Sequence, residues 1–163
     1  MKTKKNNSKA SLRLALQIAC KEMDLPTRQE FHSWATVALA NHFKEKLELC
    51  IRIVEPKESK ELNFRYRGKN KPTNVLSFSY DEHQEAGATK LLGDLVLCAE
   101  LIKQEALTQS KALQAHWAHL TIHGVLHLLG YDHQTTAQAK TMETLEIAIL
   151  QQLNFNNPYL VRK

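Results

Sequence analysis

"HGVLHLLGYDH", residues 123–133, sets three histidines at offsets of four and six: His123, His127 and His133. An α-helix turns about 100° per residue, so the first two imidazoles share one helix face, roughly 40° apart around the axis. His133 would lie on the far side if that helix continued. Gly130 predicts that the helix ends between them, because glycine readily adopts the left-handed conformation found at helix ends. We therefore expect the chain to turn back and bring the third ring to the other two.

These three histidines, called the His triad below, predict a metal site. Three nitrogen ligands leave one position of a tetrahedral zinc ion open, which is typical of a catalytic site and not of a structural one. An isolated His–x3–His pair is usually found without a metal, but a third histidine behind a helix-ending glycine favours binding. We predict one bound Zn²⁺, although imidazoles also accept other divalent transition metals.

The residue after the first histidine is Gly124. Metalloproteases with the HExxH motif carry a glutamate there, which takes a proton from the metal-bound water and passes it to the leaving amine. Glycine can do neither, so cleavage of peptide bonds is disfavoured. A phosphodiester has a better leaving group and requires mainly metal and cationic stabilisation of negative charge. We therefore expect the cation elsewhere in the chain.

Two further histidines, His116 and His119, lie on the same helix face as His123 and His127. They precede His123 by two turns and one turn, too far away to complete the same metal shell. Either they support the ligands or contact the substrate, with His119 the better candidate, or they are packed residues. The spacing leaves both readings open.

Candidate cations lie in "FRYRGKNKPTNVLSF", residues 64–78. Basic and aromatic side chains are interleaved there: Arg65, Arg67, Lys69 and Lys71 with Phe64, Tyr66 and Phe78. Basic side chains bind phosphates, and aromatic rings stack on unpaired bases. A solvated loop has a similar composition, so this stretch predicts nucleic-acid binding only weakly by itself. The net charge of +5 favours a polyanionic partner in the same weak sense.

Length and composition indicate one globular domain. The chain of 163 residues, 43% hydrophobic and 24% charged, can bury a single core. We expect a disordered basic tail at residues 1–10 and one domain over 11–163. The sequence contains neither a membrane span nor a signal-peptide core, which predicts a cytoplasmic protein without a membrane partner. The cysteines, Cys20, Cys50 and Cys98, form no CxxC pair and are expected to be reduced.

The spacing of apolar residues predicts an α+β fold, with alternation for strands and helical spacing for helices. The expected strands are 11–19, 47–54, 73–80 and 91–98. The expected helices run from Pro26 to about Phe43, from Pro56 to about Gly68, and from Ala99 onward with breaks near Ser110, Gly130 and Asn154. The first two strands are expected to be parallel and the last two antiparallel, in a small mixed four-stranded sheet packed with helices. The metal-binding helix would be similar to that of zinc metalloproteases.

Two elements have more detailed signals. In the first strand, Leu12, Leu14, Leu16 and Ile18 alternate as on a half-buried strand. In the last helix, Thr135 and Gln138 predict a capping box. The buried stripe of that helix is predicted to be Met142, Leu145 and Ile149.

Four stretches form a combined signature: "LNFRYRGKNKPTNVLSF" (62–78), "LLGDLVLC" (91–98), "AHWAHLTIHGVLHLLGYDH" (115–133) and "NPY" (157–159). With them the chain closely resembles the YbeY family of bacterial metallo-endoribonucleases, from about residue 12 to 159. The resemblance implies a single-strand-specific endoribonuclease with one metal ion, preferably zinc. It also implies a role in maturing the 3′ end of small-subunit ribosomal RNA and in ribosome quality control.

The resemblance also assigns roles to residues. The His triad matches the family's metal ligands, and Arg67 in "YRGK" matches an arginine regarded as necessary for activity. Lys69, Lys71 and His119 are candidates for contact with RNA or for support of the ligands. Three departures from the family pattern, Asn70 for aspartate, Ser79 for proline and Asn157 for aspartate, touch neither the triad nor Arg67.

Parts of the mechanism stay open at this point. Asp132 either orients a ligand imidazole or caps a helix or turn. The general base is not identified, and either water or a ribose 2′-hydroxyl can be the attacking group. Family kinship suggests ribosomal RNA, the small ribosomal subunit and the assembly GTPase Era as partners. Two rival functions are a metallopeptidase with another base and a ribosome-binding module with structural zinc.

Overall fold

Four strands and five helices make up the part of the chain that the computed structural model describes, residues 11–40, 42, 45–80 and 89–160. The strands are β1 (Ser11–Ala19), β2 (Lys46–Val54), β3 (Val75–Ser79) and β4 (Lys90–Cys98). The helices are α1 (Arg28–Leu39), α2 (Pro56–Arg67), α3 (Ala99–Thr108), α4 (Leu113–Leu128) and α5 (Thr136–Gln152). The predicted α+β class is confirmed, while the predicted tail, residues 1–10, lies outside the described residues.

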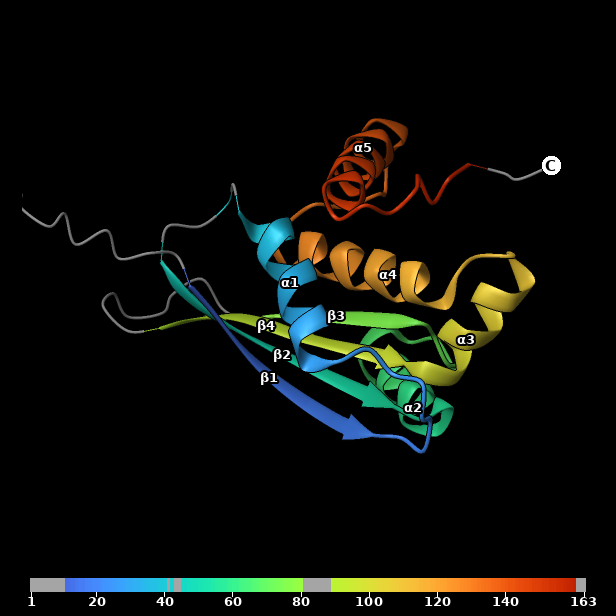
Figure 1. Ribbon diagram of the computed structural model, residues 1–163. Coiled ribbons are helices and arrows are strands. Elements are labelled where there is room, and N and C mark those ends of the chain that lie inside the picture. Colours follow the sequence, from blue (N-terminus) through green and yellow to red (C-terminus); the bar gives the residue numbers. More distant parts are fainter. Residues whose placement is uncertain (1–10, 41, 43–44, 81–88, 161–163) are drawn as a thin grey trace, which may run out of the picture.

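One mixed sheet holds the four strands in the order β1-β2-β4-β3 (Figure 1). β2 pairs in parallel with both β1 and β4, and β3 runs antiparallel to β4. A parallel pair requires a long crossover, which α1 provides between β1 and β2. Both predicted pairings, parallel for the first two strands and antiparallel for the last two, are therefore confirmed.

Helices cover the two faces of the sheet unequally. α1 and α4 pack on one face, α5 lies on the outer side of α4, and α2 lies on the opposite face (Figure 1). The main core lies between the sheet and α1 and α4, where Phe31 contacts Trp34 and Trp117 edge to face. None of the helices in the described ranges is long and apolar enough to cross a membrane.

The structure differs from the sequence expectations at two element ends. α1 ends at Leu39 and not near Phe43, and His42 lies in the turn after it. There, His42 Nε2 is 2.8 Å from the Tyr131 hydroxyl, so the ring contacts the loop after α4 and not the core. In β1 the alternation holds for Leu14, which is buried, but Ile18 is 57% exposed at the end of this edge strand.

The break after α4 and the cap of α5 follow the sequence prediction. Gly130 has a φ of +101°, a left-handed conformation that favours glycine, and the Tyr131 N–H donates to the Leu126 carbonyl at 3.1 Å. At the start of α5, the Thr135 hydroxyl accepts from the Gln138 N–H, and the Gln138 side chain accepts from the Thr135 N–H. The chain therefore reverses direction between α4 and α5, within the stretch that contains His133.

Gly124 allows α4 to lie close to the sheet. A Cβ atom at this position would be 2.8 Å from Leu95 Cδ2 on β4 and 3.3 Å from Val75 Cγ2 on β3. The Ser77 hydroxyl of β3 donates to the Gly124 carbonyl at 3.2 Å, which ties the helix to the same strand. The position at which a metalloprotease has its glutamate therefore faces the sheet.

We expect Gly124→Glu to destabilise the fold by more than about 3 kcal/mol, because it overpacks the helix–sheet contact and buries a carboxylate beside Leu95 and Val75. Urea unfolding followed by circular dichroism measures the effect. Gln114→Glu is the matched control, since it adds the same charge in the first turn of α4, where the helix dipole favours an anion. Equal unfolding midpoints for Gly124→Glu and the wild type would contradict the close packing.

Candidate metal centre

The His triad gathers at the C-terminal end of α4 and in the loop behind it. His123 and His127 belong to α4, and His133 follows the turn at Gly130. The Nε2 atoms of His123 and His127 are 3.1 Å apart. One nitrogen of each of the three rings lies within 4.8 Å of the other two. The structure thus brings together the three residues that the sequence predicts as ligands.

This donor set fits a single divalent ion. Tetrahedral zinc with Zn–N bonds of about 2.0–2.1 Å separates its ligand nitrogens by about 3.3 Å. The His123–His127 pair is already close to that spacing, and a nitrogen of the exposed His133 ring lies within 4.8 Å of both. Within the described ranges, this is the only group of three or more His, Cys, Asp or Glu side chains with the spacing of a metal site.

Glu146 of α5 orients the His123 ring. Its Oε1 atom is 2.8 Å from His123 Nδ1, while His123 Nε2 faces His127. A carboxylate that accepts from one imidazole nitrogen fixes the tautomer in which the other nitrogen has a free lone pair. Such a carboxylate commonly lies behind a zinc-bound histidine and increases its basicity. The arrangement therefore prepares His123 to bind a metal through Nε2.

Glu146 is absent from the residues that the sequence predicts for the site. The predicted stripe of α5 consists of Met142 and Ile149, which are buried, and Leu145, which is half-buried. Glu146 lies in the same stripe and has no exposed surface. A carboxylate within an apolar stripe was the available signal, because a buried charge requires hydrogen-bonding partners.

Tyr159 and His119 complete the hydrogen bonds of this carboxylate. The Tyr159 hydroxyl donates to Glu146 Oε2 at 2.6 Å, and His119 Nε2 is 3.0 Å from Glu146 Oε1. His119 Nε2 is also 3.2 Å from the Tyr159 hydroxyl. The structure therefore places His119 beside the carboxylate that orients His123, and it connects the "NPY" segment to the same point.

The pKa shifts favour an ionised Glu146, a protonated Tyr159 and a neutral His127. Burial would raise the pKa of the Glu146 carboxyl, but hydrogen bonds from His119, His123 and Tyr159 lower that pKa to about 2. Burial and the Glu146 carboxylate raise the pKa of the Tyr159 phenol, so it remains a donor. Burial and the neighbouring histidine charges lower the pKa of His127, which favours the neutral, metal-binding imidazole.

Asp132 and His116 lie close to this network but have other contacts. Asp132 Oδ1 accepts from the His133 backbone N–H at 2.8 Å, which is the geometry of a turn cap. His116 is buried, and its Nε2 is 3.0 Å from Glu105 Oε1. The carboxylate that orients a ligand imidazole in the structure is therefore Glu146 and not Asp132.

Arg67 contacts β3 at the edge of the sheet. It is the last residue of α2, is exposed, and donates through Nη2 to the Ser77 carbonyl of β3 at 3.0 Å. The Ser77 hydroxyl donates in turn to the carbonyl of Gly124, the neighbour of His123. Two hydrogen bonds thus connect Arg67 with the backbone of the metal-binding helix.

Lys69 and Lys71 lie in the loop between α2 and β3, with exposed side chains. Two buried polar residues of α2 hold the backbone of this loop: Asn63 donates to the Lys71 carbonyl and Ser59 to the Thr73 carbonyl, each at 2.8 Å. In the part of the chain that the structure describes, no contact joins either lysine to the His triad. The structure therefore places these lysines on the surface and not in the metal centre.

Comparisons with known proteins identify a matching family model, a similar protein and a similar fold. The family model described as "Endoribonuclease YbeY" matches residues 17–154. A Colwellia psychrerythraea protein named "Endoribonuclease YbeY" is 50% identical over 148 residues, which cover 89% of this chain and 95% of the relative. The solution structure of TM1509 from Thermotoga maritima has a TM-score of 0.55 at 19% identity, over 85% of this chain and 91% of that chain. The last comparison shows a shared fold.

We expect the metal-free protein to bind one equivalent of Zn²⁺ and His123→Ala to lose this binding. At free zinc of about 100 times Kd, the wild type should gain about 2.7 kcal/mol of stability, because the ion binds the folded state. Titration calorimetry gives the stoichiometry, and thermal unfolding gives the stabilisation. His42→Ala removes an exposed histidine outside the triad and should bind zinc normally. The same stoichiometry in His123→Ala and wild type would contradict the assigned ligands.

Glu146→Gln should weaken zinc binding about 10–100-fold, because the amide keeps the shape of the side chain but loses the charge behind His123. Competition with a chelating dye measures the Kd. Glu143→Gln, at an exposed position of the same helix, makes the same change in net charge and should leave the Kd unaltered. An equal loss of affinity in the two variants would assign the effect to overall charge.

Proposed function

Because the chain belongs to the YbeY family, we propose that it is a metal-dependent endoribonuclease that cleaves single-stranded RNA. The observation that carries this proposal is the His triad with its nitrogens within 4.8 Å of one another and a buried carboxylate behind His123. Three protein ligands leave a zinc ion one position for a phosphate oxygen or for water. We propose zinc as the ion, because three imidazole ligands with one open position are typical of catalytic zinc sites.

The residues of the chain have separate roles in the proposed reaction. A bound ion would supply Lewis-acid stabilisation of the phosphoryl group or of the attacking oxygen. Glu146 holds His123 in the metal-binding tautomer. Arg67, exposed at the sheet edge, neutralises the negative charge that develops on the phosphoryl oxygens. Neither the Lewis-acid stabilisation nor the charge neutralisation by Arg67 involves an acid at position 124.

A pair of aromatic rings is the observation that favours a single-stranded substrate. Tyr66 and Phe78 lie edge to face with centroids 5.2 Å apart, and Tyr66 is 58% exposed. The Arg65 guanidinium lies 5.7 Å from the Tyr66 ring centroid. Exposed rings beside cations stack on unpaired bases, whereas the bases of a duplex are already stacked on one another. Lys69 and Lys71 extend the same surface for contacts with phosphates.

The metallopeptidase alternative has less support. A peptidase needs a group that carries a proton from water to the leaving amine. Position 124 faces Leu95 and Val75, and the side chain of Glu146 is only 1% exposed and bound to three partners. Neither position offers a carboxylate to a bound peptide.

The proposed biological setting rests on kinship with the YbeY family and on the sequence. We propose that one domain, residues 11–163, acts in the cytoplasm on the 3′ end of small-subunit ribosomal RNA and in ribosome quality control. The small ribosomal subunit and the assembly GTPase Era are the proposed partners. The basic net charge of +5 is consistent with a polyanionic substrate such as ribosomal RNA.

We expect the zinc-loaded protein to cleave an unstructured RNA and to leave a duplex of the same sequence intact. Arg67→Ala should reduce kcat by about 10²–10³-fold, because one charge-stabilising donor is lost, and His123→Ala should abolish cleavage. Gel analysis of end-labelled RNA gives the rates. Arg28→Ala, at an exposed position of α1, is the matched control and should retain wild-type rates. Full cleavage by Arg67→Ala would contradict the role of Arg67, and full cleavage by His123→Ala would contradict the metal mechanism.

A further inference from the structure

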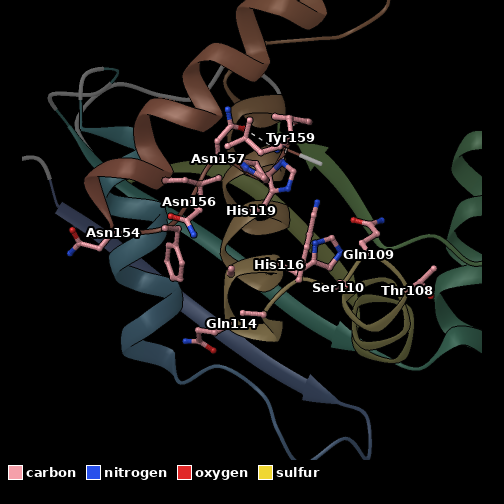
Figure 2. Close-up of a pocket in the computed structure, with 17 residues that line it drawn as sticks. Thr108, Gln109, Ser110, Gln114, His116, His119, Asn154, Asn156, Asn157 and Tyr159 are labelled. Atoms are coloured by element: carbon pink, nitrogen blue, oxygen red, sulfur yellow. Dashed lines mark hydrogen bonds between the residues drawn. The ribbon is translucent and has the colours of Figure 1, made fainter. Parts of the chain in front are cut away.

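A cavity of about 790 Å³ lies beside the candidate metal centre, toward the N-terminal end of α4. Its walls are the end of α3, the first turns of α4, and the segment after α5 that ends in "NPY" (Figure 2). In this view, Asn156 and Asn157 lie to one side of His119, while Gln109 lies to the other side of His116. The volume is within the range of about 300–1,000 Å³ that small-molecule sites occupy.

The cavity shares a wall with the metal centre. His119 and Tyr159 line it, and both bind the Glu146 carboxylate that orients His123. Because Tyr159 donates to Glu146 at 2.6 Å, its ring has a fixed position while remaining 40% exposed. A molecule in the cavity would therefore contact side chains that are one hydrogen bond away from the carboxylate behind a metal ligand.

The chemistry of the lining suits a nucleobase. Five amide side chains line the cavity: Gln109, Gln114, Asn154, Asn156 and Asn157. Each amide offers both a donor and an acceptor, as the edges of bases do. Among the described residues that line the cavity, Lys111 is the one lysine or arginine, and none of them carries a carboxylate. Such a lining tolerates a phosphate but provides most of its hydrogen bonds to an uncharged ring.

Two buried nitrogens in the wall have no partner. His116 and His119 are 4% and 8% exposed, and the Nδ1 atom of each has no hydrogen bond within the described structure. A buried polar atom without a partner costs free energy, and both of these rings line the cavity. The described hydrogen bonds of both rings are made through Nε2, to Glu105 and to Glu146, so they leave the two Nδ1 atoms without a partner.

We propose that this cavity is a nucleotide subsite, which holds one unpaired base of the RNA next to the bond that is cleaved. This inference rests on the proposed ribonuclease function. The base stacks on the Tyr159 ring and its edge binds the amides of Gln109 and Asn156, while Lys111 contacts an adjacent phosphate. Tyr159 and Glu146 thereby connect the subsite that selects the base with His123 of the metal centre.

The test uses the zinc-loaded full chain and an RNA with one cleavage site, made with an abasic nucleotide at each position around that site. In the wild type, one abasic position should reduce kcat/KM by about tenfold or more, because a stacked base is lost. In a Gln109→Ala, Asn156→Ala double variant, removal of the base at that position should have a much smaller effect. The double variant and the abasic nucleotide each remove the same contact between protein and RNA. Gln151→Ala, Gln152→Ala is the matched control and should keep the wild-type response, because neither glutamine lines the cavity.

The outcomes distinguish this proposal from the proposed function. Cleavage with the same abasic response in the wild type and the Gln109, Asn156 variant would overturn the subsite and leave the nuclease in place. If no RNA is cleaved, the nuclease is overturned, and fluorescence anisotropy with the same RNAs tests the subsite alone. Binding that loses its dependence on one base in the double variant would then support the subsite. Equal binding of all the RNAs by the wild type and the variant would overturn it.

Discussion

A buried carboxylate connects the elements that form the candidate site. Glu146 has no exposed surface and binds His119 and His123 of α4 and Tyr159 of the C-terminal segment. A charge in the protein interior is stable only when its hydrogen-bonding capacity is filled, and loss of one partner leaves an uncompensated charge. The positions of α4, α5 and the "NPY" segment therefore depend on one another, and the His123 ring depends on all three.

The two sides of α4 contact different parts of the structure. On one side, Gly124 brings the helix backbone against Leu95 and Val75, so that the helix is seated on the sheet. On the other side, His119 and His123 contact Glu146 of α5. Because the glycine occupies the place of a protease glutamate, the same feature that seats the helix removes the acid that peptide cleavage requires. Packing and reaction class are thus linked at one residue.

The two surfaces that we propose for RNA lie at different points along α4. Arg67 and the Tyr66–Phe78 pair belong to α2 and β3, and Ser77 connects them to the carbonyl of Gly124. The cavity lies at the other end of the helix, with His119 and Tyr159 in its wall. On the proposed function, a single strand contacts cations and rings on one side of the metal centre and amides on the other. Unpaired RNA suits both surfaces because its bases are free to stack and to bind by their edges.

Sequence reasoning was most successful where the determining interactions are local. Helical spacing and the left-handed Gly130 predict where α4 ends and how His133 returns, and these depend on residues within about two turns. Alternation of apolar residues predicts the four strands for a similar reason, whereas their pairing directions follow from the lengths of the connections between them. Even so, α1 ends earlier than the spacing predicts, and His42 beyond it contacts Tyr131, 89 residues further along the chain.

By itself, the sequence determined the element order and the convergence of the His triad, because backbone geometry at short range is sufficient for both. It also indicated the mixed sheet, because the connections limit how the strands pair. Only the tertiary structure decided that Glu146 orients His123, that Tyr159 closes the network, and that α3, α4 and the last segment enclose a cavity. These contacts join residues 23 and 13 positions apart, on separate elements. A buried carboxylate signals in sequence that it requires partners, but the packing of α5 against α4 selects which residues they are.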